Sequence, residues 1–384
     1  NFLLTKEMKT IHNISLITLL MSILALPVSC SLTWADPADG GGNLEGEMTI
    51  EVDQPLIRAD GNSSATIIVK IGGVEVTEGV ILYDASTNKV VDIPGMKFTT
   101  NTPGRYSFWA AYKTKHSETV TVTAISAAIP ELPADPSPTS TDFSRRVLIQ
   151  QFTGTNCGFC PFMVNLLRNF GASPANEGKW ILAAIHTYNQ SDPAYISTPI
   201  DGAMGVGSYP TACLDLDKTT RWSNYNDLNG FQKLFNTEYN SAKAKAGIAL
   251  ASVLDGNQLV VKLGVKAAED GVYGLALWVL EDGINGKQAN NGASGTESYD
   301  IHNNCVRLIV GQNSSKDFSG EKVSLKAGEM VERYYLLDIQ DDWVGANMHI
   351  LGIVNTLNPS GDAYTANNVV NCPVDDSVAY SYNN

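Results

Sequence analysis

Two cysteines three residues apart are the side chains of this sequence whose type and spacing most directly suggest chemistry. Cys157 and Cys160 follow the apolar run at 147–152 and precede a run whose apolar residues recur three and four apart up to Phe170. This pattern predicts a buried strand, then the cysteine pair, then a helix that begins near Cys157. The backbone N–H groups and the dipole at a helix N-terminus favour an anion. Cys157 is therefore the candidate attacking thiolate, and Cys160, one turn later, would resolve the mixed disulfide.

A second motif lies about fifty residues further on. Tyr209, Pro210 and Thr211 directly precede the short apolar segment 212–214, which predicts a further strand. The order is then a strand (147–152), the cysteine pair with its helix, a strand (180–185), the tyrosine-proline motif and a helix (228–245). Alternation of strands and helices predicts an α/β domain.

With these motifs, the chain resembles the thioredoxin superfamily and, more closely, the Omp28-related outer-membrane lipoproteins of Bacteroidetes, over residues 147–384. The resemblance implies that Cys157 and Cys160 are a catalytic redox pair. It also implies that Pro210 is cis and that Tyr209, Pro210 and Thr211 position the backbone of a substrate peptide. Gln151 stands where thioredoxins keep a buried acid, and a neutral amide cannot serve as that base.

Each of these residues also has a structural explanation. Cys157 and Cys160 could form a structural disulfide on a binding scaffold. A zinc site needs four ligands, which usually come as two pairs a few residues apart in sequence. The other candidate ligands, His186 and Cys213, lie on separate strands and do not form such a pair. We therefore expect no metal and no cofactor. His186 is more simply explained as a histidine at a strand end, held by a hydrogen bond, than as a catalytic base.

The remaining cysteines predict an unpaired thiol. Without Cys30 there are five, an odd number. Cys305 and Cys372 could form a structural disulfide, which would leave Cys213 as a small buried residue. Sequence alone does not fix the pairing, so a bond from Cys213 to another cysteine stays open.

The N-terminus has the pattern of an export signal. Lys9 precedes an apolar run at 14–26, and small residues lead to Cys30. The end of this segment resembles a bacterial lipobox, which implies that Cys30 carries a lipid anchor. The resemblance also implies that the mature protein lies in the cell envelope, at the outer membrane, on its periplasmic or surface face. An ordinary cleaved signal, or a buried cysteine in an uncleaved anchor, is the alternative. The polar, glycine-rich residues after Cys30 suit a flexible tether.

The patterns predict a multidomain fold with three folded parts. An N-terminal immunoglobulin-like β-sandwich is expected at 46–125, where short alternating segments are separated by turn formers. A proline-rich linker at 126–142 leads to a central thioredoxin-like α/β domain at 143–246 and a C-terminal β-sandwich at 247–384. Residues 1–30 are the upstream residues and signal, and 31–45 the tether. The glycine- and asparagine-rich segment 282–302 is expected to be a surface loop where ligands or partners dock.

Composition and net charge limit the classes of partner that the chain can bind. The 43% of apolar and 17% of charged residues fit a globular chain, and the net charge of −14 without basic clusters argues against nucleic acid. We expect thiol–disulfide exchange with exported proteins, helped by a partner that recycles the cysteine pair. The direction of exchange, the client and the oligomeric state stay open. The alternative is a surface binding or structural lipoprotein in which the cysteine pair is only a structural disulfide.

Overall fold

The structure is a computed structural model that describes residues 17–18, 44–295, 298–358, 360–361 and 363–383. The chain divides into a smaller compact unit that ends at Ile129 and a larger one that contains Ile17 and the residues from Pro130 onward. Cys30, the signal segment around it and most of the tether lie outside the described residues. In the part that is described, no helix is both long enough and apolar enough to cross a membrane.

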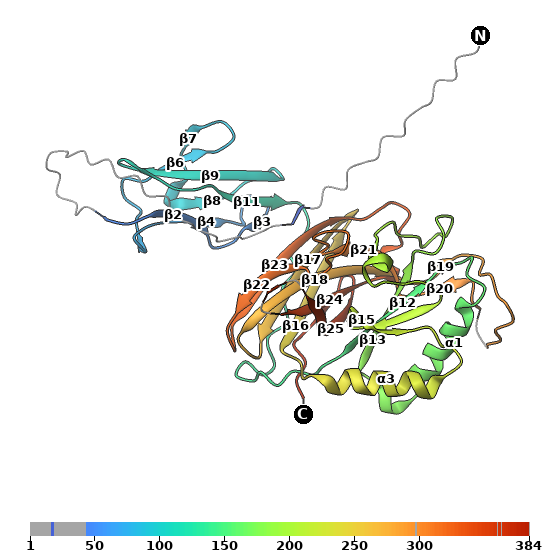
Figure 1. The fold of residues 1–384 in the computed structure, drawn as a ribbon. Coiled ribbons are helices and arrows are strands. Elements are labelled where there is room, and N and C mark those ends of the chain that lie inside the picture. Colours follow the sequence, from blue (N-terminus) through green and yellow to red (C-terminus); the bar gives the residue numbers. More distant parts are fainter. Residues whose placement is uncertain (1–16, 19–43, 296–297, 359, 362, 384) are drawn as a thin grey trace, which may run out of the picture. The chain divides into compact units, whose positions relative to one another are not determined.

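The smaller unit consists of two β-sheets with one core between them (Figure 1). In β4 (Ala65–Ile71) every second residue is buried, the pattern of a strand with one face on a core. Ile67 and Val69 of β4 share that core with Phe108 and Val122 from the other sheet. This arrangement fits the expected immunoglobulin-like sandwich. One sheet has the order β3 (Leu56–Arg58), β11 (Val120–Ile125), β9 (Gly104–Tyr112), β6 (Ile81–Asp84) and β7 (Lys89–Val91), with β10 (Lys115–His116) on β9; the other has β2 (Met48–Val52), β4 and β5 (Val74–Glu75), with β8 (Lys97–Phe98) on β4.

The larger unit is built on two further sheets. A nine-stranded sheet has the order β15 (Asp217–Trp222), β14 (Thr211–Leu214), β12 (Val147–Thr153), β13 (Trp180–His186), β21 (Cys305–Val310), β18 (Gly271–Glu281), β24 (Met348–Leu357) and β25 (Tyr364–Pro373), with β22 (Glu321–Leu325) on β18. A five-stranded sheet has the order β1 (Ile17–Thr18), β23 (Met330–Asp338), β17 (Gln258–Ala267), β16 (Ala246–Asp255) and β26 (Ser377–Val378). A small pair, β19 (Ile284–Asn285) and β20 (Ile301–His302), lies in the segment between β18 and β21.

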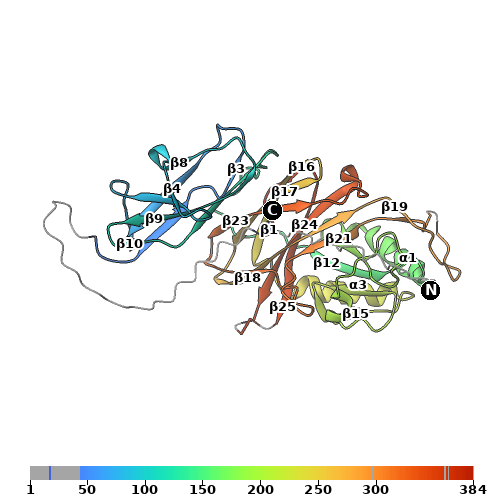
Figure 2. The ribbon, with the colours of Figure 1, turned by 90° about the horizontal axis from the view of Figure 1, so that it is seen from above.

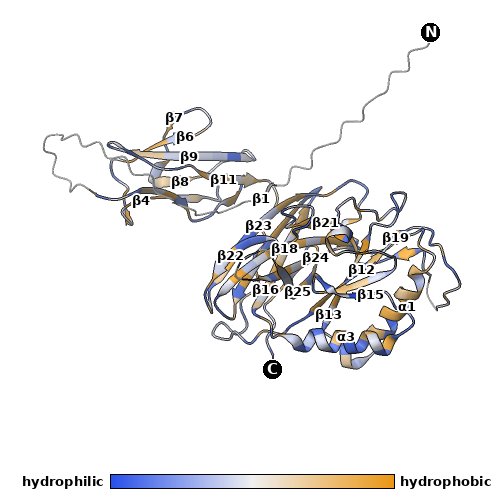
Figure 3. Cartoon of the chain, in the orientation of Figure 1, coloured by the Kyte–Doolittle hydropathy of each residue, from blue (hydrophilic) through white to orange (hydrophobic). Residues whose placement is uncertain are grey.

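Two helices cover one face of the nine-stranded sheet where it carries the cysteine motif. α1 (Cys160–Gly171) and α3 (Leu228–Ser241) lie side by side (Figure 2), and α2 (Ile200–Ala203) is a single turn. Phe170 of α1 and Phe231 of α3 pack on Val147 and Ile149 of β12. Residues along α1 are largely hydrophobic in Figure 3, as expected for a helix that buries most of one side. Alternate residues of β12, among them Leu148 and Phe152, face a second core on the opposite side of the sheet.

The expected fold class is wrong in its centre. In the residues that the structure describes, the larger unit is mainly β-sheet and contains no separate thioredoxin-like α/β domain. Its helices have only 12, 4 and 14 residues. β13 pairs in parallel with β21, through Ala184 and Cys305, so β12–β15 continue into the C-terminal strands as one sheet. Hydrophobic periodicity identifies a strand but not its partner strand. The two sheets that face each other across the core of Leu250, Leu263 and Leu277 fit a sandwich architecture.

Candidate functional site: a covered disulfide between β12 and α1

The cysteine pair lies in a tight turn between β12 and α1. Cys157 and Cys160 are joined by a disulfide. The N–H of Cys160 donates to the carbonyl of Cys157 at 3.1 Å, and α1 begins at Cys160 with Pro161 in its first turn. The helix thus starts one turn after Cys157, since residues 157–159 form the turn that leads into it. Cys157 is 4% exposed and Cys160 is 1% exposed.

The N-terminal end of α1 favours negative charge. α1 has no acidic residue in its first turn and has Arg168 in its last turn. The positive end of the helix dipole is therefore not neutralised from within the helix. A thiolate formed at the N-terminal end of α1 would be stabilised by that field.

Side chains from the loop after β13 fix the backbone of the turn. A carboxylate oxygen of Asp192 accepts the N–H of Thr155 at 2.7 Å. The side chain of Asn189 accepts the N–H of Asn156 at 3.2 Å and donates to the hydroxyl of Thr155 at 3.2 Å. Neither Asp192 nor Asn189 was expected to belong to the site, and no spacing in the sequence connects them with the cysteines.

His186 is held by the same carboxylate. Its Nδ1 lies 2.8 Å from Oδ2 of Asp192, and its Nε2 lies 3.6 Å from the sulfur of Cys305. The expectation of a histidine at a strand end, held by a hydrogen bond, is confirmed. Burial alone would raise the pKa of Asp192, but the hydrogen bond and charge of His186, together with the N–H groups of Ala194 and Thr155, outweigh burial and lower this pKa to about 2.

Replacing Asp192 by asparagine should therefore cost stability in a pH-dependent way. A carboxyl whose pKa is lowered on folding stabilises the fold above its unfolded pKa, and that contribution is lost as pH falls through about 2. We expect Asp192→Asn to lower the free energy of unfolding by about 2 kcal/mol at pH 7 and by much less at pH 2.5. Urea unfolding at the two pH values measures this. Asp338→Asn, at an exposed position, is the control. If the stability lost in Asp192→Asn does not change with pH, the lowered pKa of Asp192 is contradicted.

The tyrosine-proline motif lies at the same end of β12 as the disulfide. β14 pairs antiparallel with β12, and Thr211 is opposite Phe152, so Pro210 comes beside the strand end from which the cysteine turn leaves. The Tyr209–Pro210 peptide bond is cis. The Tyr209 hydroxyl is 2.9 Å from the Thr187 hydroxyl and donates to Asp201 at 2.8 Å, and the Thr211 hydroxyl donates to the carbonyl of Ser208. Burial raises the pKa of Tyr209 to about 12.

A segment distant in sequence covers the turn. Residues 286–295, here called the strap, belong to the segment 282–302 for which a docking loop was expected. The N–H of Ala289 donates to the carbonyl of Thr155 at 2.7 Å, and the N–H of Asn291 donates to the carbonyl of Gly158 at 2.8 Å. The composition of the strap indicates a loop, but nothing in the sequence indicates that it covers the cysteines.

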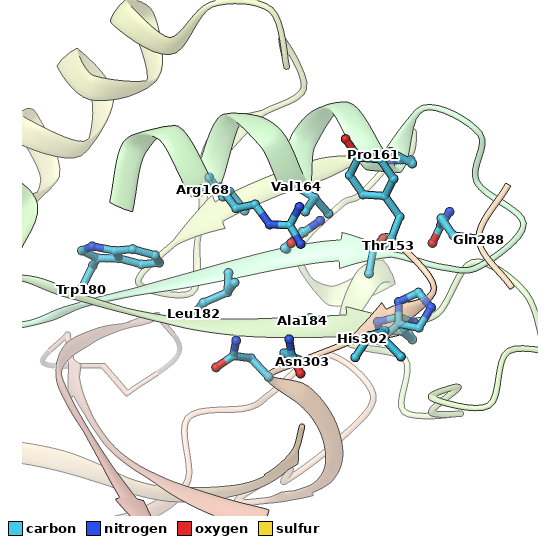
Figure 4. Close-up of a pocket in the computed structure, with 16 residues that line it drawn as sticks. Thr153, Pro161, Val164, Arg168, Trp180, Leu182, Ala184, Gln288, His302 and Asn303 are labelled. Carbon is cyan, nitrogen blue, oxygen red and sulfur yellow. The ribbon is translucent and has the colours of Figure 1, made fainter. Parts of the chain in front are cut away.

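A cavity of about 190 Å³ lies between α1 and the strands β12 and β13. Figure 4 shows Arg168 and Val164 on the helix side, Leu182 on the sheet side, and Gln288 and His302 at one end. Gln151, which faces α1, also lines it, and none of the described lining residues is a carboxylate. Among the described residues, no group of three or more His, Cys, Asp or Glu side chains is placed to hold a metal ion. The disulfide of Cys157 and Cys160 is the redox-active group at this site.

The possible Cys305–Cys372 disulfide is not formed in the structure, where both residues are free and buried, as is Cys213. Cys305 lies on β21 and Cys372 on β25, and β18 and β24 lie between these strands. Neighbouring strands are about 4.8 Å apart, so three steps separate the two cysteines by about 14 Å. A disulfide needs Cα atoms closer than about 7 Å. Burial raises the pKa of Cys213 to about 12 and also raises that of Cys305, as suits inert core thiols.

Comparison with known proteins gives one family match and several similarities to solved structures, two of which follow. No curated protein sequence matches the chain. HBP35 of Porphyromonas gingivalis is 14% identical, with a TM-score of 0.48 over 64% of this chain and 79% of its own. A protein from Agrobacterium tumefaciens is 13% identical, with a TM-score of 0.37 over 61% of this chain and 96% of its own. Residues 199–377, a range that begins after the cysteine pair, match the family model for the outer membrane protein Omp28, so this part of the chain is similar to a family of outer-membrane proteins.

Proposed function

We propose that this chain is a cell-envelope protein that exchanges thiols and disulfides with exported proteins through Cys157 and Cys160. The observation that carries the proposal is the disulfide in the turn that leads from β12 into the N-terminal end of α1. A disulfide in that position has a helix dipole to stabilise the thiolate that forms when it opens. The other described cysteines are buried and form no disulfide, and burial raises the pKa of each thiol, so they do not compete for this role.

In this exchange the client protein carries two thiols. A client thiolate attacks the sulfur of Cys157, the Cys157–Cys160 bond breaks, and Cys160 leaves as a thiolate that takes up a proton. The second client thiolate then attacks the client sulfur of the mixed disulfide, and Cys157 leaves with the electron pair. The client has lost two electrons and two protons, and the cysteine pair has gained them. The same steps in reverse reduce a client disulfide.

Cys157 is the attacked sulfur for two geometric reasons. It is the more exposed of the two cysteines, at 4% against 1%, and it precedes the helix rather than lying inside its first turn. Pro210 and its neighbours, beside the end of β12, are proposed to position the client backbone. The matched range of the outer-membrane family supports placing this reaction in the envelope. Attachment through a lipid on Cys30, and a partner that recycles the cysteine pair, are part of the same proposal.

The competing proposal is a binding or structural protein in which the disulfide only holds the turn closed. The low exposure of Cys157 and the strap above it favour this alternative. The two proposals differ in the reduction potential that they require. A disulfide that exchanges in an envelope has a midpoint between about −120 and −270 mV, whereas structural disulfides lie below about −300 mV.

An equilibrium redox titration of the Cys157–Cys160 pair in the folded chain separates them. The chain is equilibrated in buffers of defined thiol–disulfide ratio, quenched with acid and alkylated, and the reduced fraction is read by mass. We expect a midpoint within the exchanging range. A midpoint below about −300 mV would leave the structural disulfide as the function of the pair.

A further inference from the structure

The strap makes contacts with the cysteine turn that have the form of a bound peptide. Its N–H donors at Ala289 and Asn291 are two residues apart and point to the carbonyls of Thr155 and Gly158. A peptide that adds to an exposed backbone edge also donates from alternate residues. The strap does so without forming a strand, since residues 286–290 have no regular secondary structure and Asn291 lies in a bend. The carbonyl edge of the turn is therefore a docking edge for an extended segment, and in this structure the chain fills that edge itself.

Side chains of the strap complete the cover. The amide nitrogen of Gln288 lies 3.0–3.3 Å from the carbonyl oxygens of Gly154, Thr155 and Cys157, and 3.0 Å from that of its neighbour Ala289, and its two hydrogens are shared among these four acceptors. Asn291 lies over Gly158, where an added Cβ would collide with its side chain. The strap thus spans the turn from Gly154 to Gly158, on either side of the first cysteine.

The cover is held by polar contacts that water can replace. Asn290, Asn291 and Gly292 are exposed, and within 288–295 only Gln288 and Ala293 are buried. A segment with few apolar contacts opens locally at a small fraction of the cost of unfolding the core. Its replacement by another extended segment exchanges one set of backbone hydrogen bonds for an equivalent set.

Exposed aromatic side chains flank the same turn. Phe159, within the turn, is 47% exposed, and its ring lies 6.0 Å from that of Tyr225. Tyr188 is 48% exposed, and an added Cβ at Gly154 would collide with its own Cβ. Large apolar side chains are exposed in chains that have not yet folded and are buried afterwards.

We propose that the carbonyl edge of the cysteine turn, with Phe159 and Tyr188 beside it, binds an extended, apolar segment of an unfolded exported protein that carries a cysteine. The strap occupies this edge in the resting protein, and the client must displace it to reach Cys157. This inference rests on the proposed exchange function and names its substrate class and its control.

The test uses the whole chain and three single variants. Gln288→Ala removes the amide that the three carbonyls share, and Ala289→Pro removes the N–H donor to Thr155 while leaving the exposed strap residues unchanged. Lys287→Ala is the matched control, since this side chain is 90% exposed and contacts Asp300 rather than the turn. Thermal unfolding of each variant first shows that it is folded.

The readout is the rate at which the Cys157–Cys160 bond opens with two reductants. One is dithiothreitol, which transfers two electrons and closes into a ring. The other is a peptide dithiol with apolar residues around its cysteines. We expect Gln288→Ala and Ala289→Pro to react about ten-fold faster than the wild type with both reductants, because each loses hydrogen bonds that hold the strap closed. Lys287→Ala should stay within about two-fold of the wild type, as expected for an exposed surface side chain.

The two ways of failing are distinguishable. If the peptide dithiol reacts with the wild type, and Gln288→Ala and Ala289→Pro react no faster, the strap proposal is overturned while the exchange function stands. If no form of the protein reacts with the peptide dithiol, even where the variants speed the reaction with dithiothreitol, the exchange function is overturned and the docking proposal falls with it.

Discussion

Replacing Arg145 by methionine is expected to lower the free energy of unfolding by about 3–5 kcal/mol, because it leaves a buried carboxylate without its partner. Arg145 precedes β12 and is 7% exposed. Its guanidinium donates to Asp215 at 2.6 Å, to the carbonyls of Glu238 and Tyr239 at 3.0 Å each, and to the carbonyl of Asn367 at 3.1 Å. One side chain therefore ties the start of β12 to the end of α3 and to β25.

The loss of stability is large because Asp215 is fully buried, so water cannot replace the guanidinium as its partner. Burial raises the pKa of Asp215, and the Arg145 guanidinium and the N–H of Leu148 act against that rise and favour the carboxylate. Its other carboxylate oxygen accepts the N–H of Leu148 at 2.7 Å, so the group also holds the backbone of β12. Without the guanidinium, the fold must bury either an unpaired charge or a protonated acid in a site built for an ion pair.

Urea unfolding of Arg145→Met, Asp215→Asn and the double variant measures this coupling. The double variant should lose less stability than the sum of the two single variants, since the second change removes the unpaired carboxylate. A loss below about 1 kcal/mol for Arg145→Met, the size of an ordinary surface ion pair, would contradict the structure around this residue.

Local patterns in the sequence predict the elements that carry the site. The apolar run at 147–152 predicts β12, and the spacing of Met163, Leu166, Leu167 and Phe170 predicts α1, because both patterns depend only on neighbouring residues. The position of the cysteine pair between these elements follows from the same local patterns. The distribution of glycine and asparagine likewise predicts a loop at 282–302.

Pairing between distant segments is what the sequence does not predict. β13 meets β21 through Ala184 and Cys305, more than a hundred residues apart, and no local pattern encodes that choice. For this reason a separate α/β domain was expected where the structure has one continuous sheet. The contacts of Asp192 with Thr155, and of Gln288 with the cysteine turn, depend on the same long-range assembly. Polar loop residues of this kind have no periodicity that would distinguish them from ordinary surface residues.

The second large effect is expected at Cys160. When Cys160 is replaced by serine, Cys157 is a free thiol at the N-terminal end of α1, with no neighbouring thiol to resolve what it attacks. Mixed with a peptide whose single cysteine is joined to a small aromatic thiol, Cys160→Ser should attack the peptide sulfur and release the aromatic thiol. The product is a stable mixed disulfide between Cys157 and the peptide.

Cys157→Ser is the matched control for this trap. It keeps Cys160, which is 1% exposed and lies inside the first turn of α1, so it should not react. The double variant Cys157→Ser/Cys160→Ser reports any background from Cys213, Cys305 and Cys372, all of which are buried. Dithiothreitol should release the peptide from Cys160→Ser and restore the original mass.

The mass of the intact chain after this reaction is the most direct test of Cys157 as the attacking sulfur. We expect Cys160→Ser to gain the mass of one peptide in the folded protein, with no gain in Cys157→Ser or in the double variant. If Cys160→Ser gains no peptide until urea unfolds it, or if Cys157→Ser reacts equally well, Cys157 is not the attacking sulfur and the disulfide only holds the turn together.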